Sequence, residues 1–143
     1  MAELHAVGSS LHWAVVRGEE PDRLLGQVAL SGLGHGVSPT GEVGYWVHPD
    51  ARGRGVATRA VRAASRHGLL ALDEGGLGLR RVLLRAAEGK TASCAVARAV
   101  GFTEVGRDRD GVGTRRGSVA DHLRFDLLAE EMDAAWAHPS SLR

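Results

Sequence analysis

The sequence predicts a single α/β domain in which a mixed, mostly antiparallel sheet carries two main helices. Its 143 residues are the length of one ordinary domain. Three short apolar runs separated by turn residues occupy the first 47 positions. Beyond them, two segments with the apolar period of amphipathic helices alternate with further strand-like runs. The expected order is β-β-β-α-β-α-β-β, with residues 1–10 as an N-terminal segment and 129–143 as a C-terminal tail.

The three N-terminal strands are expected at residues 12–17 (HWAVVR), 24–30 (LLGQVAL) and 42–47 (EVGYWV). The segment GEEPD (18–22) reads as a turn, and a glycine-rich loop follows the second strand. Pro49 ends the third strand, because proline cannot donate to a central ladder. Connections this short favour an antiparallel meander.

The two helices are predicted at residues 56–72 and 93–100. In the first, one face carries Ala57, Ala60, Val61, Ala64, Gly68 and Leu72, and the other carries Arg59, Arg62 and Arg66. The run between the helices, 81–86 (RVLLRA), suits a buried parallel strand. Gly101 is expected to end the second helix as a C-cap. Residues 102–107 and 118–128 complete the sheet as a hairpin, before a short terminal helix at 129–136.

Composition excludes several classes of protein. The chain is 43% hydrophobic and 24% charged with a net charge of +1, which favours a soluble protein over a partner of nucleic acids or membranes. The single cysteine, Cys94, excludes an internal disulfide, and the seven histidines have no metal-ligand spacing, so no metal site is predicted. No segment resembles a signal peptide or a membrane span, so a cytoplasmic location is expected.

Gly89-Lys90-Thr91, between a predicted strand and a predicted helix, is similar to the end of a nucleotide phosphate loop. The complete motif requires a glycine five positions before Gly89, so that backbone N–H groups can surround a phosphate. Leu84 occupies that position, within the strand. The sequence therefore argues against an ATP or GTP site here.

A better phosphate-binding pattern lies at residues 47–60 (VHPDARGRGVATRA), where a strand ends and the long helix begins. Gly53 and Gly55 let the backbone approach a ligand, and the first N–H groups of the helix lack intrahelical partners. A helix N-terminus favours an anion, and Arg52 and Arg54 add positive charge. This arrangement would suit a diphosphate, although an ordinary glycine-containing helix start has the same appearance.

These residues carry a family resemblance. The stretch 52–57 (RGRGVA) fits the pattern Arg/Gln-x-x-Gly-x-Gly/Ala and resembles the acetyl-CoA pyrophosphate loop of GNAT-superfamily acetyltransferases. The longer stretch GEVGYWVHPDARGRGVA (41–57) resembles the Rim-type branch, which acetylates protein N-termini such as that of a ribosomal protein. AVARAVGF (95–102) resembles a later helix and strand start of that family. The resemblance extends over about residues 11–128.

The resemblance implies acetyl-CoA as a co-substrate and assigns residues to hold it. It places a splayed or bulged strand near Trp46 and Val47, whose backbone would face the pantetheine and the acetyl carbonyl. The pyrophosphate loop would comprise Arg52, Gly53, Arg54, Gly55, Val56, Ala57 and Thr58. Lys90 and Ser93 would also contact the co-substrate. Lys90 stands where the family has asparagine and, having donors but no acceptor, cannot fully replace it.

The resemblance also implies the catalytic groups. Glu42 is the candidate base that removes a proton from the acceptor amine, and Ser93 is the candidate acid for the departing CoA thiolate. A non-catalytic role stays open for each residue. Glu42 could be an exposed carboxylate on a strand, and Ser93 could be a residue at a helix start that bonds to the backbone. Tyr45, on the opposite strand face from Glu42, is expected to pack, as is Cys94.

The family's usual N-terminal strand and two short helices, which wall the acceptor site, are not expected in the roughly ten residues before position 12. Apolar edges left bare there would favour a homodimer. The predicted function is acetyl transfer from acetyl-CoA to a primary amine, with a protein or peptide N-terminus as the leading acceptor. Two alternatives remain: a non-catalytic acyl-CoA-binding module, and an acetyltransferase for a small molecule such as an antibiotic or polyamine.

Overall fold

A computed structural model of the chain describes residues 2–7, 10–33, 39–113 and 119–136. Its seven strands form one sheet in the order β1-β2-β3-β4-β5-β7-β6. The strands are β1 (Ala2–Val7), β2 (Ser10–Arg17), β3 (Glu20–Ser31), β4 (Thr40–Val47), β5 (Arg81–Ala87), β6 (Thr103–Gly113) and β7 (Val119–Leu128). All neighbouring strands are antiparallel except β4 and β5, which are parallel. The mixed, mostly antiparallel fold class is therefore confirmed.

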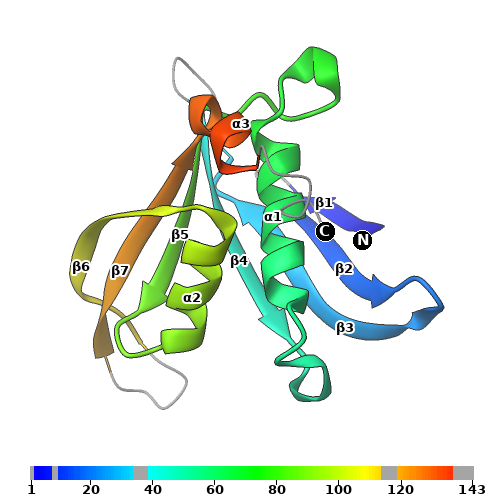
Figure 1. Cartoon of the computed structure of the whole chain (residues 1–143), viewed down its shortest axis with the longest axis horizontal. Coiled ribbons are helices and arrows are strands. Elements are labelled where there is room, and N and C mark those ends of the chain that lie inside the picture. The colour runs from blue at the N-terminus through cyan, green and yellow to red at the C-terminus, as the bar shows by residue number, and fades with distance from the viewer. Residues whose placement is uncertain (1, 8–9, 34–38, 114–118, 137–143) are drawn as a thin grey trace.

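The helices lie on one face of this sheet (Figure 1). They are α1 (Val56–Leu69), α2 (Thr91–Val100) and the single turn α3 (Met132–Ala135), with 3-10 turns η1 (Pro49–Ala51), η2 (Leu72–Glu74) and η3 (Ala129–Glu131). In the part of the chain that the structure describes, no helix covers the opposite face of the sheet. None of the described helices is both long enough and apolar enough to cross a bilayer.

The core lies between the sheet and the helices. Its most deeply buried large side chains are Phe125, Leu30, Leu84 and Leu127, each under 2% exposed. Helix α1 comes close to the sheet at Gly68, where an added Cβ would lie 3.1 Å from Leu30 Cδ1. Close packing of this kind leaves little room for larger side chains.

The structure differs from the sequence-based prediction at several element boundaries. Residues 1–10 were not expected to hold a strand, but β1 pairs there with β2, from Ala2 opposite Ala14 to Val7 opposite Ser10. Helix α1 ends at Leu69 rather than at residue 72, and Leu72 is 76% exposed instead of facing the core. Strand β3 begins at Glu20, inside the predicted turn, because pairing with β2 continues to Arg17 opposite Glu20. The Gly101 cap is confirmed, with φ +107°.

Candidate active site

Strands β4 and β5 separate partway along the sheet. They pair at only three positions, Thr40–Arg81, Gly41–Val82 and Glu42–Leu83. Beyond that point β4 stays paired with β3 as far as Val47, while β5 stays paired with β7 as far as Ala87. The splay that the family resemblance implied is therefore present, and the β3–β4 ladder contains no bulge.

The opening leaves backbone groups of β4 directed toward a gap. The His48 N–H donates to the Leu25 carbonyl at 2.7 Å, so the backbone of His48 faces β3. In an antiparallel pair, alternate residues direct their N–H and C=O groups to opposite sides. Tyr45 and Val47 therefore direct theirs toward the gap. Such fixed amides can bind an acyl carbonyl or the amides of a pantetheine arm.

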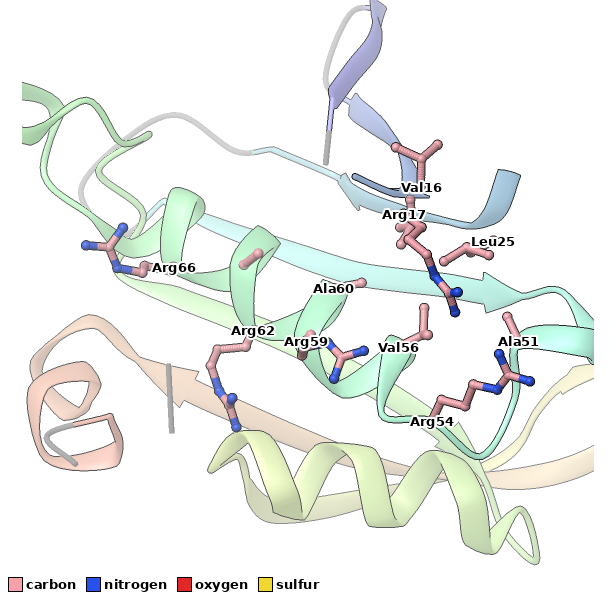
Figure 2. A pocket seen from close by; sticks show the side chains of 12 residues that line it. Val16, Arg17, Leu25, Ala51, Arg54, Val56, Arg59, Ala60, Arg62 and Arg66 are labelled. Carbon is pink, nitrogen blue, oxygen red and sulfur yellow. The ribbon is translucent and has the colours of Figure 1, made fainter. Parts of the chain in front are cut away.

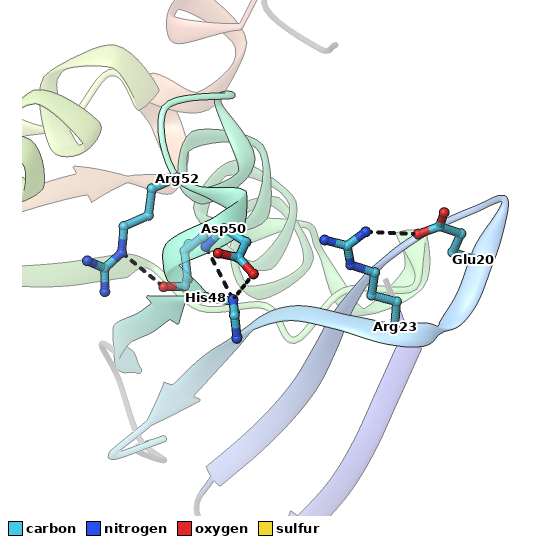
Figure 3. A network of polar contacts seen from close by, with 6 residues as sticks. Glu20, Arg23, His48, Asp50 and Arg52 are labelled. Atoms are coloured by element: carbon cyan, nitrogen blue, oxygen red, sulfur yellow. Dashed lines mark hydrogen bonds and ion pairs between the residues drawn. The ribbon is translucent and has the colours of Figure 1, made fainter.

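The turn after β4 shapes the start of α1. The Asp50 N–H donates to His48 Nδ1 at 3.2 Å, and Arg52 Nε donates to the Val47 carbonyl at 3.2 Å (Figure 3). Gly53 and Gly55 both have φ +75°, a conformation that L-residues rarely adopt. The first bond of the helix runs from the Arg59 N–H to the Gly55 carbonyl at 3.1 Å. The amides of residues 55–58 precede it and lack intrahelical partners.

The space beside these glycines is open. A Cβ built on Gly53 would meet nothing within 4 Å, and one on Gly55 would meet only Arg59 Nη1, at 3.5 Å. The positive φ angles, rather than local crowding, therefore explain the glycines. Unpaired amides, a helix N-terminus and a bare backbone together make a surface that can bind a diphosphate.

The N-terminus of α2 forms the other wall. Lys90 is its exposed N-cap, with no side-chain capping bond, and the first helical bond joins the Cys94 N–H to the Lys90 carbonyl at 3.2 Å. Ser93 is half-buried in the first turn. Cys94 itself is only 6% exposed within the core, as expected of a packing residue. Helix α2 is held beside α1, with Arg62 Nη2 donating to the Ala99 carbonyl at 3.4 Å.

A cavity of about 610 Å³ lies between these parts. Strand β4 contributes Tyr45, Trp46 and Val47, and α2 contributes Lys90, Ala92, Ser93, Ala95 and Val96. The turn and the start of α1 contribute Ala51, Arg52, Gly53, Gly55, Val56, Ala57 and Thr58. Ten of the twelve predicted site residues therefore line one cavity. Its volume falls within the range of small-molecule sites.

The other two predicted residues lie elsewhere. Arg54 lines a second cavity, on the β2–β3 side of α1. Glu42 lies on the sheet face without helices, at the last paired position before β4 and β5 separate. The Trp46 side chain also lies on that face, 41% exposed, with its Nε1 donating to Gln27 Oε1 at 3.1 Å. Only the remaining part of Trp46 can therefore line the first cavity.

Charged side chains cover the helix-free face around Glu42. Arg85 Nε lies 3.9 Å from Glu42 Oε1 and 3.4 Å from Asp108 Oδ2, and Arg124 Nε lies 3.5 Å from Asp108 Oδ1. Arg85 and Arg124 are directly opposite in the β5–β7 ladder. Asp108 between them offsets the repulsion of two facing cations. This face is therefore polar, with a carboxylate at the apex of the splay.

Sequence reasoning missed several lining residues. Ala92, Ala95 and Val96 bring small side chains to the cavity from one face of α2. Their spacing of i, i+3 and i+4 could have indicated this, but small apolar residues also indicate a core face. Tyr45 packs against the core as expected and also lines the cavity.

Comparison with known proteins identifies the family to which the chain belongs. The model of the acetyltransferase (GNAT) domain matches residues 2–103, most of the chain. The protein therefore belongs to the GNAT acetyltransferase family. Its relatives fit the Rim-type branch that the sequence resembles.

Three relatives illustrate the likeness. The Bacillus subtilis (strain 168) protein named "Putative ribosomal N-acetyltransferase YdaF" is 34% identical over 110 residues, covering 77% of this chain and 56% of the relative. The structure of Mycobacterium smegmatis RimJ in complex with CoA-disulfide is 30% identical, with a TM-score of 0.70, over 87% of this chain and 56% of that one. Ribosomal-protein-S5-alanine acetyltransferase from Vibrio fischeri shares the fold, with a TM-score of 0.74 at 21% identity, over 86% of this chain and 63% of that one. The chain thus spans little more than half the length of the first two.

Proposed function

We propose that this protein transfers the acetyl group of acetyl-CoA to a primary amine, with the N-terminus of a protein or peptide as acceptor. The observation that carries the proposal is the cavity of about 610 Å³ that joins the α1 N-terminus to the splayed edge of β4. The name of the Bacillus relative, a putative ribosomal N-acetyltransferase, supports the choice of acceptor class, and the Mycobacterium relative was solved in complex with CoA-disulfide.

The helix side of the sheet would hold the acetyl-CoA. Its diphosphate would lie against the amides of Gly55, Val56 and Ala57, with Arg52 beside them. The pantetheine arm would run along the gap, where the backbone of Tyr45 and Val47 offers hydrogen bonds. The thioester would then lie near the apex of the splay, with amides directed at the carbonyl oxygen that gains charge during attack.

The amine would approach from the other face of the sheet. Glu42 is the carboxylate at the apex on that face, and its side chain is 37% exposed. It would accept a proton from an ammonium group, directly or through one water. The free amine then attacks the acetyl carbon, the new C–N bond forms, and the C–S bond of the thioester breaks.

The attacking nitrogen loses a second proton as the amide forms, and the leaving thiolate needs one. The Ser93 hydroxyl would pass this proton from the nitrogen to the sulfur and be regenerated in the same step. This hydroxyl lines the cavity from the first turn of α2, on the side from which the pantetheine would pass. Lys90 lines the same wall with three donors and no acceptor. It would therefore interact with phosphate or carbonyl oxygens rather than take both roles of the family asparagine.

The expected homodimer remains a proposal, and the exposed side chains indicate what kind of surface it would use. Among the described residues, four large apolar side chains are exposed, Leu24, Trp46, Leu72 and Val105, and they belong to four different elements. Any association through the helix-free face would therefore be largely polar. Sedimentation at micromolar concentration tests this, and a monomeric mass would contradict the homodimer.

The function is tested by following release of the CoA thiol with a panel of acceptors. The panel contains peptides with a free N-terminus, the same peptides with a blocked N-terminus, and spermidine. We expect turnover with the free peptides alone. Acyl-CoA binding without turnover on any acceptor would identify a binding module, and turnover on spermidine alone would identify a small-molecule enzyme. Failure to bind acyl-CoA would contradict all three.

A further inference from the structure

A second cavity, of about 500 Å³, lies on the other side of α1, between that helix and strands β2 and β3 (Figure 2). Ala51 and Val56 line both cavities, so the first turn of α1 separates them. The proposed binding of acyl-CoA does not involve this second cavity. Its lining differs from that of the first cavity, because five of its twelve residues are arginines, whereas Arg52 is the one arginine that lines the first. Neither cavity has an acidic lining residue.

Three of these arginines surround the same part of the cavity. Arg17 comes from the end of β2, Arg54 from between the loop glycines, and Arg59 from α1 (Figure 2). In Figure 2 their guanidinium groups lie around Val56, while Arg62 points toward α2 and Arg66 points away. The arrangement thus concentrates three positive charges at one end of the cavity.

These three side chains lack acidic partners. Among the residues that the structure describes, no hydrogen bond or ion pair involves the guanidinium groups of Arg17, Arg54 or Arg59. Arginines on the opposite edge of the molecule do have such partners, as in Arg107 Nη2 to Glu88 Oε1 at 2.6 Å. Unneutralised cations close together repel one another, and an anion bound among them would remove that repulsion.

The floor of the cavity is apolar. Leu25 and Val56, under 10% exposed, form a small core cluster with Ala51, and Ala60 continues this surface along α1. Guanidinium groups pair with phosphate or carboxylate oxygens in a planar fork, whereas the floor offers only dispersion and burial of apolar surface. A ligand that satisfies both parts carries a compact anionic head and a short apolar body.

We propose that this second cavity is a binding site for a small amphipathic organic anion, distinct from the acyl-CoA site. The anionic head lies among Arg17, Arg54 and Arg59, and the apolar body lies against Leu25, Val56 and Ala60. The site does not depend on the acyl-CoA assignment, because none of these arginines lines the first cavity.

Calorimetric titration with hexyl phosphate, at fixed ionic strength and below its micellar range, tests the site. We expect saturable binding at one site in the presence of saturating CoA, and binding at least roughly tenfold weaker for inorganic phosphate and for hexanol, each of which supplies only half of the contacts. Binding of inorganic phosphate as tight as that of hexyl phosphate would contradict a role for the apolar floor.

Variants locate the binding. Arg17→Ala and Arg59→Ala, both at exposed positions, should each weaken hexyl phosphate binding by about tenfold, because each removes a charge-assisted hydrogen bond. Ala63→Trp, at an exposed position that lines the cavity, should block it by filling the space. The control Arg109→Ala, an exposed position on β6 at the far edge of the sheet, should have no effect.

The alternatives give different patterns. Equal weakening by Arg17→Ala and Arg109→Ala would show a general charge effect and overturn the site. Unchanged binding in both Arg17→Ala and Arg59→Ala would show that the ligand binds outside the second cavity. Competition of hexyl phosphate with CoA would place it in the first cavity, and either result would overturn the proposed site. Failure of the protein to bind CoA would contradict the proposed function while leaving this titration interpretable.

Discussion

The two faces of the sheet at the β4–β5 opening differ in the groups that they expose. On the helix side, the cavity wall is mostly backbone and small residues, with Gly53 and Gly55 at φ +75°. On the other side, charged side chains from four strands form the surface, with Arg85 between Glu42 and Asp108. Backbone suits a co-substrate with invariant phosphates and amides, whereas side chains can be varied to suit an acceptor. The two halves of the proposed reaction should therefore respond separately to mutation.

The largest effect is expected from Glu42→Gln. Loss of the base should lower kcat by about 10²- to 10⁴-fold, the usual contribution of a positioned acid or base. The dissociation constant for acetyl-CoA should stay unchanged, because Glu42 lies on the opposite face from the first cavity. Turnover assays and calorimetry on the same preparation measure the two quantities.

The matched control for that variant is Glu104→Gln, at an exposed position on β6. It should leave both quantities unchanged. A loss of acetyl-CoA affinity in Glu42→Gln as large as its loss of turnover would refute the separation of the two faces.

Alanine variants of two neighbouring residues of β5, whose side chains lie on opposite faces of the sheet, should differ in stability. Leu84 is 1% exposed on the helix side, so Leu84→Ala should lower the free energy of unfolding by about 2–5 kcal/mol. Leu83 is half-buried on the other face, so Leu83→Ala should lower the free energy of unfolding by less than about 1.5 kcal/mol. Urea unfolding of both variants measures the difference, and equal losses would show that both faces are packed alike.

The smallest effect is expected from Lys90→Met, which removes the charge but keeps a long side chain. The side chain is exposed, so acetyl-CoA should bind roughly two- to fivefold more weakly in low salt. The difference should shrink near 1 M salt, where screening shortens the range of charge interactions to about 3 Å. An effect that persists undiminished in high salt would instead indicate a direct hydrogen bond from Lys90.

The sequence predicted the helix-side cavity far better than the opposite face. Glycine positions, the helix N-terminus and the strand before it are local features, and ten predicted residues meet in one cavity. The placement of Arg54 was not predictable, because the direction of a side chain between two glycines depends on their positive φ angles. The pairing of Arg85 with Asp108 joins β5 to β6, two strands that are not neighbours in the sheet, and no local pattern reveals it.

Strand β1 shows the same limit. Its six residues have weak strand character of their own, and they form an edge strand through pairing with β2. The end of α1 at Leu69 is likewise set by a tertiary contact, because the chain turns so that the Leu79 N–H donates a hydrogen bond to the Gly68 carbonyl at 2.9 Å. Apolar periodicity alone therefore extended the predicted helix too far.

Calorimetric titration of acetyl-CoA into Gly55→Asp and Gly55→Asn tests the central claim most directly. Both residues tolerate positive φ better than other side chains, so both variants should fold, which thermal unfolding verifies. The aspartate adds a negative charge beside the amides that would bind the diphosphate, and should weaken binding at least roughly tenfold more than the neutral asparagine of the same shape. Equal affinities for the two variants would show that the phosphates do not bind at the start of α1, and would contradict the account.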